Sequence, residues 1–86
     1  MIKIKLKFFG IYNEIFGPEM DILIKDDSSL IELKTHLLNS LFETKINYLI
    51  KTFDKSLFSN DERILTNDYV IKNNEIIYLL PPFSGG

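Results

Sequence analysis

Residues 2–8 alternate strictly between apolar and basic side chains. Ile2, Ile4, Leu6 and Phe8 are separated by three lysines. Because successive side chains of a β-strand point to opposite sides, this period of two predicts a strand with one buried face and one face in water. Such a strand needs a second apolar layer, so the pattern indicates a sheet that is covered on one side.

The size and composition of the chain limit what can cover that sheet. The chain has 86 residues, 45% hydrophobic and 26% charged, with a net charge of −2. These values are typical of one globular domain and lack the positive charge of a nucleic-acid binder. Residues 2–8 do not resemble a signal peptide, and no uncharged stretch approaches the roughly 18 apolar residues that cross a bilayer. We therefore expect a cytoplasmic protein that binds neither nucleic acid nor membrane.

A second strand and a helix follow the first strand. Met20, Ile22 and Ile24 alternate with Asp21, Leu23 and Lys25. This pattern predicts a strand that pairs with the first as a hairpin, after a connection at residues 11–18 with one helical turn. Ser29 and Glu32 match a capping box, in which each residue satisfies a free backbone donor of the other, and predict a helix start. The apolar stripe of this helix comprises Leu30, Leu33, Leu37 and Leu41, widened by Ile31 and Leu38.

The second half of the chain predicts three further strands. Residues 48–53 are rich in aromatic and β-branched side chains, which favours a third strand, and Leu57 and Phe58 form a short fourth. Residues 60–74 are predicted to form a loop pinned by a few apolar side chains. Residues 76–80 are apolar throughout, as in a central strand, which the prolines at 81 and 82 end.

The predicted order of elements is β-β-α-β-β-β. This order indicates an α+β fold, in which one main helix packs across one face of a mixed sheet. The first and last strands then become parallel neighbours at the centre. We expect one domain over residues 1–80 and an extended, flexible tail over residues 81–86.

The tail carries the most specific sequence signal. A terminal Gly85-Gly86 pair arises by chance in roughly one chain in 200 at average glycine usage. Pro81 and Pro82 favour an extended exit from the last strand, so the end of the chain projects away from the domain. Glycine adds no side chain, so this end can enter a narrow channel in another protein.

The terminal carboxylate of Gly86 is the candidate reactive group. The chain contains no cysteine, so this terminus is the only place where it can carry transferable sulfur. Conversion to an acyl-adenylate supplies a leaving group, which a sulfur nucleophile from a partner can displace to give a thiocarboxylate. A terminus without function is the alternative interpretation.

Residues 72–76 (Lys-Asn-Asn-Glu-Ile), residues 81–86 (Pro-Pro-Phe-Ser-Gly-Gly) and the order of elements resemble the MoaD/ThiS family of ubiquitin-like sulfur carriers. The resemblance spans essentially the whole chain and is greatest to the small subunit of molybdopterin synthase, although residues 46–60 match only loosely. It implies a β-grasp fold.

The resemblance also implies a reaction cycle and partners. A ubiquitin-activating-like adenylyltransferase, which uses ATP, adenylates Gly86, and a sulfur donor protein then supplies sulfur. The tail next enters the large subunit of molybdopterin synthase, in a heterotetramer, and donates sulfur to the dithiolene of molybdopterin. The chain itself binds no cofactor and acts as a co-substrate. Alternatives are a carrier for thiazole or cysteine synthesis, a ubiquitin-like modifier joined to lysines of target proteins, and a plain binding module.

A docking surface is expected on the uncovered face of the sheet. If Ile77 and Leu79 face the helix, the residues between them and after them face outward, and an exposed apolar patch follows. Leu57 fits either this patch or the core. The expected partner-binding residues are Phe9, Leu57, Tyr78, Leu80, Pro81, Pro82, Phe83 and Ser84.

The remaining polar residues have simpler interpretations. His36 lies away from the leucine stripe and is predicted to be a surface residue. The acidic pairs at residues 26–27 and 61–62 are explained as cap and loop residues, so we expect no metal site. The lysines at positions 3, 5 and 7 either steer an acidic partner or simply face water.

Overall fold

A computed structural model describes residues 1–40 and 47–82 of the chain, and the side chains of residues 1–40 and 49–82. In this part of the chain the elements are β1 (Ile2–Phe8), α1 (Ile11–Phe16), β2 (Glu19–Ile24), α2 (Leu30–Ser40), α3 (Asn47–Asp54), β3 (Leu57–Ser59) and β4 (Ile76–Leu80).

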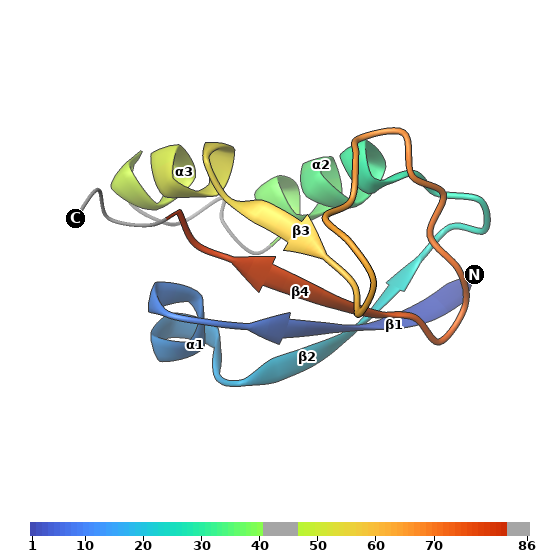
Figure 1. The fold of residues 1–86 in the computed structure, drawn as a ribbon, viewed down its shortest axis with the longest axis horizontal. Coiled ribbons are helices and arrows are strands. Elements are labelled where there is room, and N and C mark those ends of the chain that lie inside the picture. Colours follow the sequence, from blue (N-terminus) through green and yellow to red (C-terminus); the bar gives the residue numbers. More distant parts are fainter. Residues whose placement is uncertain (41–46, 83–86) are drawn as a thin grey trace.

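The strands form one mixed sheet in the order β2-β1-β4-β3. β1 pairs antiparallel with β2 and parallel with β4, and β3 pairs antiparallel with β4. The predicted α+β class and the parallel central pair are therefore confirmed. Figure 1 shows that β1 and β4 both run toward the end of the sheet at which α1 lies.

The core lies between the sheet and two helices, α2 and α3 (Figure 1). Alternate residues of β1 and β4 point into it, as the period of two requires. Leu33 and Leu37 of α2 and Leu49 and Phe53 of α3 complete it from the helix side. The buried strand residues are Ile4, Leu6, Phe8, Ile22, Ile24, Phe58, Ile77 and Leu79.

The predicted capping box is present before α2. The Ser29 N–H donates to Glu32 Oε1 at 3.0 Å, and the Glu32 N–H donates to Ser29 Oγ at 3.4 Å. The backbone N–H of Ser29 holds the pKa of Glu32 below its usual range. Leu33 and Leu37 of the predicted apolar stripe are buried. Ile31 is 46% exposed, so the assignment of Ile31 to this stripe is wrong. Leu41 lies outside the described residues.

The predicted third strand at residues 48–53 is wrong, because this segment belongs to helix α3. Leu49 and Phe53 are four residues apart, which places both on the same side of a helix, and both are buried. In a strand, Lys51 would share the side of Leu49 and Phe53 and would have to enter the core, whereas in the helix it is exposed. The short strand at Leu57 is confirmed as β3, so the sheet has four strands among the described residues instead of five.

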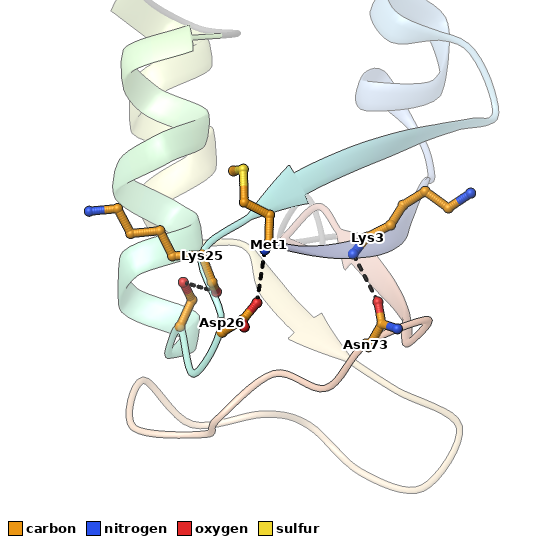
Figure 2. Close-up of polar contacts among 6 residues, drawn as sticks. Met1, Lys3, Lys25, Asp26 and Asn73 are labelled. Atoms are coloured by element: carbon orange, nitrogen blue, oxygen red, sulfur yellow. Dashed lines mark hydrogen bonds and ion pairs between the residues drawn. The ribbon is translucent and has the colours of Figure 1, made fainter.

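The long connection from β3 to β4 is tied to the first strand. The Lys3 N–H donates to Asn73 Oδ1 at 3.0 Å (Figure 2), and the Asn74 N–H donates to the Lys3 carbonyl at 2.8 Å. Leu65 and Ile71 are buried and pin the connection to the core, as expected. Beside this junction, the backbone nitrogen of Met1 lies 3.1 Å from Asp26 Oδ1 (Figure 2).

Replacing Ser29 by alanine should lower the free energy of unfolding by about 1 kcal/mol, because a helix N-cap then loses its side-chain acceptor. Urea unfolding followed by circular dichroism measures the change. Asn39→Ala, at an exposed position of the same helix, is the matched control and should change stability by less than about 0.5 kcal/mol. Equal stability of Ser29→Ala and the wild type would contradict the capping role.

Candidate functional site

The root of the C-terminal tail lies at the centre of the sheet. β4 is hydrogen-bonded to β1 on one side and to β3 on the other. Its ladder ends at Leu80, because Pro81 and Pro82 have no N–H to donate. The other predicted tail residues, Phe83, Ser84, Gly85 and Gly86, lie outside the described residues.

Four predicted partner-binding residues meet on the uncovered face of the sheet. Leu57 pairs with Leu80 across β3 and β4, and Lys7 pairs with Tyr78 across β1 and β4. Phe9 follows β1 at the same end, and its ring contacts the Tyr78 ring edge to face, with centroids 5.9 Å apart. We call this surface the outer apolar patch, and it comprises Phe9, Leu57, Tyr78 and Leu80.

The exposure of the patch residues separates them from the core. Phe9 is 42% exposed and Leu57 is 46% exposed. Ile77 and Leu79 are completely buried, as the strand parity predicts, so the residues between and after them face outward. The open question about Leu57 is therefore answered, because Phe58 enters the core and Leu57 does not.

A hydrogen bond holds the Tyr78 ring in the patch. The Tyr78 hydroxyl donates to the Asp61 carboxylate, and this bond raises the pKa of Tyr78 above its ordinary value. With Phe9 on one side of the ring and Asp61 at its hydroxyl, Tyr78 has little freedom to rotate. The orientation of the Tyr78 ring in the patch is therefore set by contacts within the chain.

Next to the patch, the lysines of β1 face the acidic residues of β2. Lys5 Nζ lies 3.0 Å from Glu19 Oε2, and this contact raises the pKa of Lys5 and lowers that of Glu19. The register also places Lys5 opposite Asp21 and Lys7 opposite Glu19. Two of the three lysines are thus balanced by carboxylates, whereas Lys3 lies opposite Leu23.

Comparison with known proteins shows the fold. No protein-family model matches the chain, and no curated protein matches it in sequence. Solved structures do match: SAMP1 from Haloferax volcanii has a TM-score of 0.75 at 15% identity, covering 98% of this chain and 99% of that one. A Pyrococcus furiosus protein assigned as molybdopterin converting factor, subunit 1, has a TM-score of 0.72 at 17% identity, covering 95% and 99%. The fold is the ubiquitin-like β-grasp.

The β-grasp domain also contains a buried polar contact that the sequence did not indicate. Tyr12 of α1 is completely buried, and its hydroxyl lies 2.7 Å from Ser56 Oγ. Because Ser56 Oγ donates its one hydrogen to the Thr52 carbonyl at 2.7 Å, the Tyr12 hydroxyl must donate to Ser56. This contact joins α1 to the junction of α3 and β3. Burial raises the pKa of Tyr12, so its hydroxyl stays protonated.

No sequence signal identified Tyr12, since residues 11–18 were expected to form a mostly irregular connection. The buried tyrosine matters because α1 begins only two residues after Phe9. Any movement of α1 would therefore move one residue of the outer apolar patch.

Other candidate sites in the β-grasp domain lie away from the tail. His36 is on the surface of α2, as predicted, and lines a groove of about 530 Å³ with Leu23 and Ile31 between β2 and α2. Among the described residues, no group of three His, Asp or Glu side chains is arranged to hold a metal ion. Within the same residues, no helix combines the length and apolarity needed to span a bilayer.

Replacing Tyr12 by phenylalanine should lower the free energy of unfolding by about 1 kcal/mol, because a buried hydrogen bond is lost while the ring volume is kept. Chemical denaturation measures this change. Tyr78→Phe is the matched control, since it removes a hydroxyl bond at the exposed surface and should cost less than about 0.5 kcal/mol. A larger loss for Tyr78→Phe than for Tyr12→Phe would contradict this assignment.

Proposed function

We propose that this chain is a sulfur carrier that works through a thiocarboxylate on Gly86, and that it is the small subunit of a molybdopterin synthase. The observation that supports the proposal most directly is the position of the tail root. Central strand β4 ends at Leu80, a residue of the outer apolar patch, and the sequence Pro-Pro-Phe-Ser-Gly-Gly follows it. A partner that docks on the patch therefore meets the start of the tail.

The chemistry of the terminus suits sulfur transfer. In the first step, the Gly86 carboxylate attacks the α-phosphorus of ATP on a partner enzyme, pyrophosphate leaves, and an acyl-adenylate forms. Hydrosulfide (HS⁻) supplied by the sulfur donor then attacks the acyl carbon and AMP leaves, so sulfur takes the place of one carboxylate oxygen. The absence of cysteine from the chain leaves no internal thiol to attack the activated acyl group.

The proposed partners follow from the MoaD/ThiS resemblance and from one structural likeness. They are an adenylating enzyme related to ubiquitin-activating enzymes, a sulfur donor protein and the large subunit of molybdopterin synthase. The likeness to the Pyrococcus furiosus protein assigned as a molybdopterin converting factor subunit supports this pathway. Thiazole and cysteine synthesis are the neighbouring pathways that the same tail chemistry serves.

A second function, that of a ubiquitin-like protein modifier, is favoured by the likeness to SAMP1, the small archaeal modifier protein 1 of Haloferax volcanii. In that case, a lysine amine of a target protein attacks activated Gly86 and forms an isopeptide bond. The two functions leave different products in cells. A modifier produces conjugates of higher mass, whereas a carrier shows only the exchange of one oxygen for sulfur.

Deleting Gly86 should abolish thiocarboxylate formation and leave the fold intact, because the tail follows the last strand of the core. Intact-mass spectrometry of protein recovered from the host measures the sulfur exchange, and thermal unfolding checks the fold. A pull-down with an N-terminally tagged chain then identifies the pathway, since a molybdopterin synthase large subunit, a thiazole synthase or a cysteine synthase would be recovered. Cofactor synthesis supported by the truncated chain would exclude the C-terminal mechanism.

Replacing Leu80 by aspartate should weaken binding of the large subunit by about tenfold or more, because a charge then enters the centre of the outer apolar patch. Ile76→Asp is the matched control, since Ile76 also faces outward on β4 but lies outside the patch. Isothermal titration calorimetry measures both affinities, and thermal unfolding should show similar stability for the two variants. Equal affinities would remove Leu80 from the interface.

A further inference from the structure

The Pro81 ring, at the start of the tail, occupies the space that a side chain at Gly10 would fill. Gly10 lies between β1 and α1 and has a φ of +58°. A methyl group on its Cα would lie 2.8 Å from Pro81 Cγ and 3.7 Å from Pro81 Cδ. Because real side chains do not approach this closely, the Pro81 ring rests where any side chain of residue 10 would have to be.

The backbone on which Pro81 rests is held firmly by its surroundings. Gly10 caps α1, and its carbonyl accepts a hydrogen bond from the Glu14 N–H at 3.2 Å. The hydroxyl of Tyr12, two residues further on, is bonded to Ser56. Phe16, at the end of α1, packs on Phe8 with ring centroids 5.3 Å apart. The contact with Pro81 is therefore made on a fixed part of the domain.

We propose that Gly10 is a positioning residue for the C-terminal tail, because its missing side chain lets Pro81 pack on the β1–α1 turn and so sets the direction of the tail. This inference rests on the proposed function, since it assigns the direction a role in delivering Gly86. Phe9, the preceding residue, belongs to the outer apolar patch. A residue of the patch and the residue on which Pro81 packs are thus consecutive in the chain.

Two consecutive prolines limit how the backbone can turn after β4. Pro81 and Pro82 have fixed φ angles, and each restricts the residue before it to extended conformations. A shift of the Pro81 ring is therefore passed on to Pro82, because few bonds between the two rings are free to absorb it. When a partner docks on the patch, such a shift misaligns the chain end with the partner's active site, and misplacement of about 1 Å can slow a reaction roughly a hundredfold.

Gly17 supplies a matched control for Gly10. Gly17 follows α1 and has a φ of +88°, so alanine is strained at both positions. A methyl group at Gly17 would meet nothing within 4 Å, whereas a methyl group at Gly10 meets Pro81. Gly10→Ala and Gly17→Ala thus share the backbone strain and differ in the contact with the tail.

The position of the tail can be measured without any partner. Since the chain lacks cysteine, Ser84→Cys provides one site for a nitroxide spin label. Paramagnetic broadening of the backbone amide signals of Phe9 and Tyr78 then reports how the tail lies relative to the patch. We expect the same broadening in the wild type and in Gly17→Ala, and a clear change in Gly10→Ala. Identical broadening in all three would overturn the proposal.

The effect on reaction is measured with unlabelled protein and the purified adenylating partner, by following ATP–pyrophosphate exchange. For Gly10→Ala we expect kcat to fall roughly tenfold to a hundredfold while KM stays within about twofold, because the docking patch is intact and only alignment is lost. Gly17→Ala should retain both values. An equal fall in both variants would show that backbone strain, and not the contact with Pro81, is responsible, and would overturn the proposal.

Two further results distinguish a failure of this inference from a failure of the variant to fold and from a failure of the proposed function. If Gly10→Ala does not fold, Pro81→Ala removes the ring without straining residue 10, and it should change the broadening and kcat in the same way. Wild-type values for Pro81→Ala would overturn the proposal. If the wild-type chain is not adenylated at all, the proposed function fails, and the spectroscopic comparison alone decides whether Gly10 positions the tail.

Discussion

The parallel pairing of β1 with β4 is the constraint on which the rest of the structure depends. Parallel neighbours require a crossover connection, and the chain between them supplies β2, the two covering helices and β3. The pairing also brings the end of β1 and the end of β4 to the same edge of the domain. Gly10 and Pro81 meet there for this reason, although they are distant in sequence.

Much of this arrangement was predictable from the sequence, because it depends on local rules. The alternation around Leu6 and around Ile22 fixed two strands and their inward faces, and the box formed by Ser29 and Glu32 fixed the start of α2. The apolar run before Pro81 gave the position of β4. These signals are strong because strand parity and helix capping involve neighbouring residues and need no knowledge of the fold.

The errors occurred where tertiary packing decides between local alternatives. The aromatic and β-branched content of residues 48–53 favours a strand, but the buried positions of Leu49 and Phe53 match a helix that fills the core beside α2. Ile31 lies at the border of the leucine stripe. It remains exposed because it lines the open groove beside edge strand β2. The contacts of Gly10 with Pro81 and of Tyr12 with Ser56 could not be predicted, since they exist only after the chain has folded.

The central position of β4 has a mechanical consequence. A partner that grips the tail and pulls along it applies force to a strand that is hydrogen-bonded on both sides. The bonds to β1 and β3 then bear the load together, in shear, and cannot open one after another from an edge. The domain should therefore resist unfolding by tension applied to its own tail, because the sheet cannot be opened without breaking both sets of bonds at once.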